Sequence, residues 1–168
     1  MNLSHVPKTF WLASNVQENW DVFSLKATAI IHLFLFTTDR KVILFMRPCG
    51  HWGPISGEIE AFENPIDTAC RETREEVGFT IDHVYLTGHS FFGISPKGKM
   101  IHGITCFAFL PDDITQEHFT LKNGEISGCL FVSQNDALSI MKNTGFPEAV
   151  RGLEYLKKEK LIERVSTA

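Results

Sequence analysis

The segment that decides the fold of this chain runs from Gly57 to Phe79 and reads G-E-I-E-A-F-E-N-P-I-D-T-A-C-R-E-T-R-E-E-V-G-F. It carries the signals of a helix with both ends marked. Asn64 is a favourable N-cap residue, and Pro65 suits the first helical position, where no backbone N–H is needed. Gly78 suits the left-handed conformation that ends many helices. The sequence therefore predicts a helix that begins after Asn64 and ends at Gly78.

The two sides of the predicted helix differ in chemistry. Its apolar face is formed by Ile66, Ala69, Cys70 and Val77, with Thr73 among them, at the spacing of one helical stripe. Three acidic side chains, Glu72, Glu75 and Glu76, are neighbours on a flank of the opposite side. Like charges this close destabilise a helix by a few tenths of a kcal/mol per pair, and a hard cation such as Mg²⁺ or Mn²⁺ would remove that repulsion. The alternative is a solvated acidic face.

Outward from this helix, the chain alternates between strand-like and helix-like segments. The predicted strands are Trp20–Leu25, Thr28–Phe36, Val42–Met46 and three segments near 82–93, 101–110 and 128–133. Thr28–Phe36 and Val42–Met46 are expected to form a hairpin, and residues 47–57 are expected to form a loop because of their glycines and prolines. Ser133 is expected to cap a helix over 134–142, and a last helix is predicted from Pro147 to about Glu163. This order favours a mixed α/β layer structure.

The length and composition suit one domain with one sizeable core. The chain has 168 residues, is 43% hydrophobic, and carries a net charge of −4 with a pI of about 6.0. It shows no basic stripe, which argues against nucleic-acid binding, and no apolar run of membrane-spanning length. Its four cysteines form no C-x-x-C pair and no basic-apolar leader precedes them, which predicts reduced thiols in a cytoplasmic protein. The expected division is one domain over 1–168, with an N-terminal extension (1–19), the sheet and glutamate helix (20–133) and C-terminal helices (134–168).

The glutamate segment resembles the signature of the Nudix hydrolase superfamily. The matching residues are Gly57, Glu63, Arg71, Glu72, Glu75, Glu76, Gly78 and Phe79. The resemblance implies an α/β/α sandwich with a mixed β-sheet, in which the motif forms a loop–helix–loop unit. It also implies hydrolysis of a nucleoside diphosphate linked to another group, X, with Mg²⁺, or Mn²⁺ as the alternative, as the cofactor.

The resemblance also implies a role for each matching residue. Glu72, Glu75 and Glu76 become metal ligands, and the carbonyl of Gly57 is a further candidate ligand. Glu63 becomes a supporting carboxylate that interacts with Arg71, which is expected to be an orienting ion-pair partner among the catalytic residues. Many members add a glutamate from a loop before a late strand, and Glu125 has that position; a solvated loop residue is the alternative. The general base is left open among Glu72, Glu76 and Glu125.

Two residues next to the motif are candidate substrate contacts. Trp52 is placed to stack on a base. Arg47 is placed to meet a phosphate at the end of a strand, with a solvent-exposed arginine as the alternative. Further aromatic candidates are Trp11, Trp20, Phe91 and Phe92, with core packing as the alternative for each aromatic residue. Three positions depart from the family pattern, namely Ser56 and Phe62, which replace glycines, and Thr73, which replaces an aliphatic residue. The missing glycines are expected to limit positive φ angles and to alter the loop.

Three hypotheses on function remain. The first is hydrolysis of a nucleoside triphosphate or a similar small nucleotide. The second is hydrolysis of ADP-ribose, a dinucleoside polyphosphate or another X-linked diphosphate, with an RNA cap disfavoured by the lack of basic surface. The third is a non-catalytic nucleotide-binding regulator, which the intact glutamate set disfavours. A homodimer is left open.

Overall fold

One mixed β-sheet lies at the centre of the protein. The computed structural model describes residues 28–94, 98, 100–144 and 147–166. The predicted extension over 1–19, the predicted strand Trp20–Leu25, and both Trp11 and Trp20 lie outside these residues. The described strands, in chain order, are β1 (Thr28–Phe36), β2 (Val42–Met46), β3 (Trp52–Gly53), β4 (Ile55–Glu58), β5 (Tyr85–Ile94), β6 (Met100–Phe109) and β7 (Gly128–Val132).

The sheet is divided around β1. Its main order is β3-β2-β1-β6-β5, while β4 pairs with β1 and β7 pairs with β2. β1 and β6 are parallel, and the other pairs are antiparallel. β1 pairs with β2 only at Leu35 and Phe36, because β4 takes the same edge of β1 from Ile30 to Leu33. This arrangement places Gly57 opposite Ile31, under the glutamate helix.

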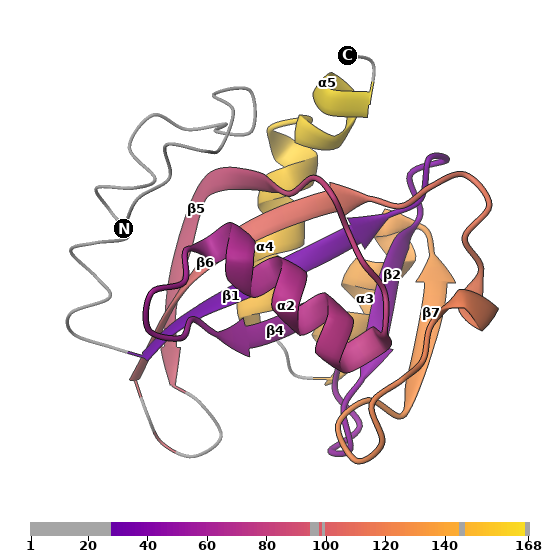
Figure 1. Cartoon of the computed structure of the whole chain (residues 1–168). Coiled ribbons are helices and arrows are strands. Elements are labelled where there is room, and N and C mark those ends of the chain that lie inside the picture. Colours follow the sequence, from indigo (N-terminus) through magenta and orange to yellow (C-terminus); the bar gives the residue numbers. More distant parts are fainter. Residues whose placement is uncertain (1–27, 95–97, 99, 145–146, 167–168) are drawn as a thin grey trace.

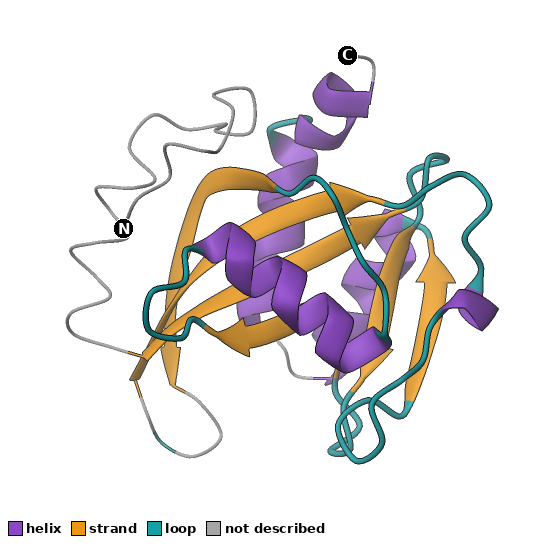
Figure 2. Ribbon diagram, in the orientation of Figure 1, coloured by secondary structure: helices purple, strands orange, loops and turns teal. Residues whose placement is uncertain are grey.

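Helices cover both faces of the sheet, which confirms the expected α/β/α architecture. α2 (Pro65–Val77) lies across one face, and α3 (Gln134–Thr144) and α4 (Pro147–Lys158) lie behind the sheet in Figure 1. Figure 2 shows the same three layers. Side chains of β1 alternate between two cores, with Ile31, Leu33 and Leu35 toward α2 and Phe34 and Phe36 toward α3 and α4. None of the described helices is long and apolar enough to cross a membrane.

The glutamate helix begins and ends as the sequence predicts. Asn64 accepts a hydrogen bond from the Asp67 N–H (2.9 Å), and the Asp67 carboxylate accepts one from the Asn64 N–H (3.3 Å), which forms a capping box. Gly78 has a φ of 66° and ends the helix in the left-handed conformation. Beyond it, the N–H groups of Thr120 and Lys122 donate to the carbonyls of Val77 and Glu76, both at 2.8 Å. The end of α2 is therefore closed by a segment more than forty residues further along the chain.

Several other predictions are confirmed. β1 and β2 have the predicted bounds and form the expected hairpin. Ser133 Oγ accepts a hydrogen bond from the Asp136 N–H (3.1 Å) before α3. The buried Thr73 hydroxyl donates to the Ala69 carbonyl at 2.7 Å, so its polar atom is satisfied within the helix.

Two predictions of secondary structure are wrong. Residues 47–57 contain β3 and most of β4, where a loop was expected; each strand is too short to produce a period of its own, and both depend on partners elsewhere in the chain. The single C-terminal helix is two, α4 and α5 (Leu161–Ser166), because Lys160 takes a left-handed φ of 52° between them. A 3₁₀ turn at Gln116–His118, η2, was also not predicted.

The expectation that missing glycines alter the loop before α2 is wrong at Phe62. Phe62 has a φ of 68° and its side chain is fully exposed. The turn around it is held by the Glu63 N–H, which donates to the Glu60 carbonyl at 3.1 Å, and by the Glu60 N–H, which donates to the Glu63 carboxylate at 2.8 Å. These bonds keep a left-handed residue at position 62 although it bears a side chain. Ser56 lies inside β4, where the structure gives it no positive φ.

Replacing Phe62 with glycine is expected to stabilise the protein. A left-handed φ costs a residue with a Cβ about 1–2 kcal/mol, while the greater freedom of glycine in the unfolded chain costs about 0.5–1 kcal/mol. The side chain buries no surface that would be lost. Urea denaturation of Phe62→Gly should show a free energy of unfolding raised by about 0.5–1 kcal/mol. Phe62→Ala is the control, since it keeps the Cβ, and an equal gain in both variants would rule out backbone strain as the cause.

A buried histidine on β1 makes stability depend on pH. His32 is 2% exposed, and its ring stacks on Phe91 with the centroids 4.5 Å apart. Burial, with smaller contributions from Arg47 and His89, lowers the pKa of His32 to about 3. The folded protein therefore holds a neutral imidazole at a pH where the unfolded chain, with a pKa near 6.5, takes up a proton. Stability from this residue is lost as the pH falls from about 6.5 toward 3.

His32→Phe is expected to remove this dependence. The contribution of His32 should fall by about 2–3 kcal/mol between pH 7.0 and 4.5. The difference in unfolding free energy between the wild-type protein and His32→Phe should change by that amount in favour of the variant, whatever other groups titrate in both. Urea denaturation at the two pH values measures it. A difference that stays constant would contradict the assignment of a neutral buried His32.

Candidate functional site

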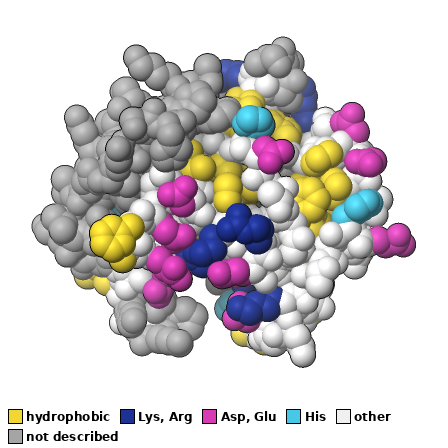
Figure 3. Space-filling view, in the orientation of Figure 1, with side chains coloured by type: hydrophobic (Ala, Val, Ile, Leu, Met, Phe, Trp, Pro, Cys, Tyr) yellow, Lys and Arg dark blue, Asp and Glu magenta, His cyan; other side chains and the backbone are white. Residues whose placement is uncertain are grey.

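The flank of α2 brings together the three predicted acidic side chains at very different depths. The side chain of Glu76 is 4% exposed and that of Glu72 is 13% exposed, while that of Glu75 is 49% exposed. Acidic and basic side chains gather over this face of the molecule in Figure 3. The flank is therefore no uniformly solvated surface, because two of its carboxylates are largely withdrawn from water.

Arg71 is the centre of an ion-pair network at the start of this flank. Its guanidinium grips Glu63 with two bonds, Nε to Oε2 at 2.7 Å and Nη2 to Oε1 at 3.0 Å. Nη1 also lies 2.8 Å from Glu72 Oε1 and 3.1 Å from Glu75 Oε2, and Nη2 donates to the Glu58 carbonyl at 2.9 Å. Arg71 holds the pKa of the Glu63 carboxyl below its usual range. Arg71 thus contacts Glu63, as the resemblance implies, and also Glu75 one helical turn along.

Glu76 is held by an arginine from another part of the chain. Arg47, directly after β2, donates from Nη1 to Glu76 Oε1 at 2.7 Å and from Nη2 to Oε2 at 3.2 Å. The backbone N–H of Ser56 also bonds the carboxylate, and Arg47 reaches the Pro54 carbonyl at 3.3 Å. Burial raises the pKa of Glu76, and the bonds from Arg47 oppose that rise. Arg47 thus meets a carboxylate of the site, where the sequence suggested a phosphate.

Gly57 lies directly against the Glu72 side chain. A Cβ at position 57 would come within 2.1 Å of the Glu72 carboxyl carbon and oxygen, so any other residue would displace Glu72. Burial raises the pKa of Glu72, with further contributions from the charges of Glu76 and Glu75, while Arg71 opposes the shift. The close approach therefore brings the β4 backbone beside the Glu72 carboxylate.

Glu125 lies close enough to Glu76 for its charge to raise the pKa of Glu76. It pairs with Lys122 at 2.9 Å, and its side chain is 49% exposed. Lys122 in turn donates its backbone N–H to the Glu76 carbonyl. The loop before β7 thus brings a fourth carboxylate to the C-terminal half of α2.

The aromatic candidates mainly pack in the core. Trp52 is partly buried against the hydrophobic cluster beneath α3 and α4, and its backbone N–H donates to the Thr144 hydroxyl at 3.4 Å. Phe91 is 4% exposed and stacks on His32. Phe92 is 47% exposed, with its ring 4.8 Å from that of His102.

The donor set suits a hard divalent cation. It consists of carboxylates and backbone carbonyls. Beyond the effect of burial, the charge of Glu76 raises the pKa of Glu72 and the charge of Glu125 raises the pKa of Glu76, and a cation would offset both effects. Across the described ranges, no three His, Cys, Asp or Glu side chains already converge on one point. The reason is visible in the ion pairs, since Glu72 turns one oxygen to Arg71 and Glu76 turns both to Arg47. Side-chain rotation would be needed to collect these oxygens around an ion.

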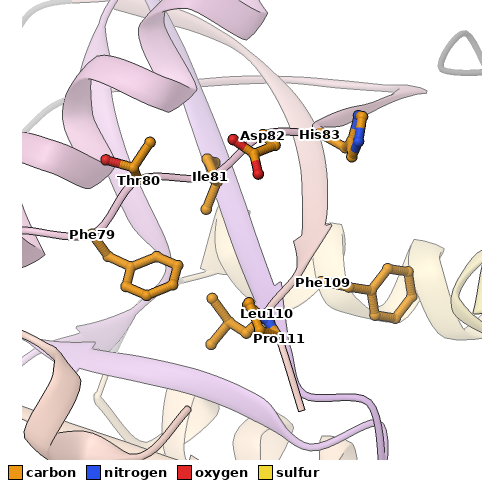
Figure 4. Close-up of a pocket in the computed structure, with 8 residues that line it drawn as sticks. All are labelled: Phe79, Thr80, Ile81, Asp82, His83, Phe109, Leu110 and Pro111. Carbon is orange, nitrogen blue, oxygen red and sulfur yellow. The ribbon is translucent and has the colours of Figure 1, made fainter. Parts of the chain in front are cut away.

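A cavity of about 270 Å³ lies beyond the C-terminal end of α2 (Figure 4). It is lined by Phe79, Thr80, Ile81, Asp82, His83, Phe109, Leu110 and Pro111. Only Phe79 belongs to the glutamate motif, and none of the four site glutamates reaches the cavity. It is therefore separate from the acidic site.

Sequence reasoning missed the groups that arrive from β4 and its flanks. These are the Ser56 N–H and the carbonyls of Pro54 and Glu58, which bind Glu76, Arg47 and Arg71 respectively. Backbone groups leave no mark in residue type, and β4 itself was not predicted. The pairing of Arg47 with Glu76 spans 29 positions and follows no local spacing.

Comparison with known proteins gives consistent similarities. A family model described as NUDIX domain matches residues 25–153. A protein described as uncharacterized Nudix hydrolase YvcI, from Bacillus subtilis (strain 168), is 33% identical over 82 residues, which cover 48% of this chain and 52% of that protein. The matched part thus spans about half the length of that relative.

Solved structures share the fold at low sequence identity. A Caenorhabditis elegans Ap4A hydrolase in a binary complex aligns with a TM-score of 0.59 at 19% identity, over 79% of this chain and 98% of its own. The E. coli dihydroneopterin triphosphate pyrophosphohydrolase gives 0.63 at 16%, over 76% and 92%. The NUDIX domain of Shewanella oneidensis NrtR, complexed with ADP ribose, gives 0.60 at 16%, over 87% and 99%. The family model covers most of the chain and includes the whole acidic site, and this chain therefore belongs to the Nudix hydrolase family.

Proposed function

We propose that this protein hydrolyses a phosphoanhydride bond in a nucleoside diphosphate linked to a group X, and that a nucleoside triphosphate or a similar small nucleotide is the first candidate. The observation that supports this most is the pair of largely buried carboxylates, Glu72 and Glu76, next to a glycine that leaves room for one of them. Even with Arg71 and Arg47 beside these carboxylates, burial and the neighbouring like charges raise the pKa of Glu72, and a divalent ion would offset the repulsion among those charges. The arrangement therefore favours a metal-dependent reaction over a structural role.

The chain's own residues would divide the work as follows. Glu72, Glu75, Glu76 and the Gly57 carbonyl would hold Mg²⁺ or Mn²⁺. When bound, such an ion supplies positive charge to the phosphate oxygens and activates water at neutral pH. Arg71 would fix the orientation of Glu72 through the bond at 2.8 Å.

The proton of the attacking water would pass to a glutamate. Glu76 and Glu72 are candidates because both lie on the flank of α2 beside the proposed ion. Glu125 remains the third candidate because it sits on the loop next to Glu76. General base catalysis is worth roughly 10²–10⁴ in rate.

The substrate class is the open part of the proposal. The relatives described above act on Ap4A or dihydroneopterin triphosphate, or bind ADP ribose, according to their descriptions. The net charge of −4 supports a small nucleotide over a nucleic acid. Partly buried Trp52 would contribute its exposed edge to a base, and Arg47 would reach a phosphate after releasing Glu76.

Product release from a substrate panel tests the proposal. The panel contains nucleoside triphosphates, nucleotide sugars, ADP-ribose and dinucleoside polyphosphates, each with Mg²⁺, with Mn²⁺ and with a chelator. Metal-dependent cleavage of one class would support the hydrolase and identify X. Tight binding of a member without turnover under any condition would instead indicate a nucleotide-binding regulator.

A further inference from the structure

Arg47 occupies both carboxylate oxygens of Glu76, a proposed ion ligand. Both Glu76 oxygens accept a bond from the guanidinium, and the two side chains are only 19% and 4% exposed. Arg47 is itself fixed by its backbone, since its N–H donates to the His51 carbonyl and its carbonyl accepts from the Gly50 N–H, both at 2.9 Å. A two-pronged, largely buried pair of this kind is strong and directional.

The second arginine of the site behaves differently. Arg71 contacts Glu72 through Oε1 alone, and its two-pronged partner is Glu63, which is not a proposed ion ligand. Arg71 can therefore keep its place while Glu72 offers its other oxygen to a cation. Within the described part of the chain, the Arg47 guanidinium bonds no second carboxylate, and its remaining contact is the Pro54 carbonyl.

A divalent ion and Arg47 therefore make conflicting demands on one carboxylate. The ion needs direct contact with a Glu76 oxygen, and a guanidinium at 2.7 Å from the same oxygen would repel it in a site that water screens poorly.

We propose that Arg47 is the internal counter-ion of Glu76 in the metal-free protein and that a divalent cation competes with it for this carboxylate. This inference rests on the proposed function, which assigns Glu76 to the ion. It gives Arg47 two successive positions, on Glu76 before the ion binds and released toward the substrate side afterward. Metal loading would then make the phosphate-binding arginine available, so that the ion binds before the nucleotide.

Mn²⁺ binding to the metal-free full chain tests the competition without reference to turnover. Free Mn²⁺ is measured by electron paramagnetic resonance during titration of wild-type protein and Arg47→Gln. Removal of the competing bonds is expected to tighten Mn²⁺ binding about 10- to 100-fold. Arg74→Gln is the matched control, since it removes the same charge from an exposed position on α2; it is expected to shift the dissociation constant by less than about threefold. Unchanged or weaker binding in Arg47→Gln, relative to this control, would overturn the proposal.

A second pair of measurements protects the test against poor folding of Arg47→Gln. Arg47→Lys keeps a charge but loses the fork, so it should tighten binding in the same direction by a smaller factor. In the wild-type protein, the two bonds to Glu76 should slow the rotation of the Arg47 guanidinium group, which its ¹⁵N–¹H signals report. Addition of Mg²⁺ should restore fast rotation. If guanidinium rotation stays slow at saturating Mg²⁺, Arg47 does not leave Glu76, and the proposed competition is overturned.

Failure of the proposed function would look different. If Glu76→Gln binds Mn²⁺ as tightly as the wild-type protein, Glu76 is not an ion ligand, and both the site assignment and the competition fail. If Glu76→Gln loses Mn²⁺ binding while Arg47→Gln does not gain it, the metal site stands and only the competition is overturned.

Discussion

Glu76→Gln is expected to lower kcat by about 10²–10⁴ while the protein remains folded. The substitution keeps the shape of the side chain but removes the charge that an ion or a transferred proton requires. The free energy of unfolding should fall, because the amide oxygen can accept from one Arg47 nitrogen only while the other nitrogen loses its acceptor. Steady-state hydrolysis of the substrate identified by the panel measures kcat, and circular dichroism checks the fold.

The matched control is Glu154→Gln. This variant carries the same Glu-to-Gln substitution on α4, where the Glu154 side chain pairs with Lys142 at 3.4 Å and is 48% exposed. Its kcat should stay within about twofold of the wild type, as expected for an exposed pair of little energetic weight. Wild-type turnover by Glu76→Gln would remove α2 from the reaction and refute the site assignment.

Arg71→Met is expected to cause the largest loss of stability. The guanidinium is 16% exposed and satisfies Glu63, which is also 16% exposed, together with Glu72 and a backbone carbonyl. Removing one partner of a buried pair costs about 3–5 kcal/mol, and removing one partner of an exposed pair costs less than about 1 kcal/mol. The partly buried network around Arg71 should lie between these limits, at about 2–3 kcal/mol. Urea denaturation at pH 7 should show a loss of that order, and added Mg²⁺ should restore part of it if the ion binds the freed carboxylates.

Arg151→Met provides the comparison for this loss. Arg151 is 54% exposed and pairs with Glu148 at 3.7 Å on the surface of α4. Its replacement should change the unfolding free energy by less than about 1 kcal/mol. If the two variants lose equal stability, the network around Arg71 is no stronger than a surface pair, and its role as an organising centre is refuted.

Features of the site that depend on local sequence were predictable. The capping box at Asn64, the left-handed Gly78 and the spacing of Glu72 and Glu76 all follow from residues within a few positions of one another. The pairing of Arg71 with Glu63 spans eight positions and was also expected. Helical geometry determines that Glu72 and Glu76 are neighbours, whereas the contact of Arg71 with Glu63, which precedes the helix, was implied by the family resemblance.

Features that depend on distant pairing were not predictable in the same way. β4 forms by pairing with one half of the edge of β1. The sequence between β2 and α2 has no alternation of polar and apolar residues that would predict this strand. The contact of Gly57 with Glu72 depends on that pairing, and the contact of Arg47 with Glu76 joins residues 29 positions apart. The conformation of Phe62 is set by a turn whose bonds override the preference of the residue itself.

The closure of α2 by Thr120 and Lys122 has a consequence for how the site opens. The loop that carries Glu125 supplies hydrogen-bond donors to two helix carbonyls, those of Val77 and Glu76. Its detachment would leave the last turn of the helix without these partners, at a cost of about 1–3 kcal/mol for each group that stays buried. The loop and the helix end therefore form one cooperative unit of local unfolding. Local unfolding of either segment would separate Glu76 from Glu125. The assembled site would therefore persist only as long as this unit stays folded.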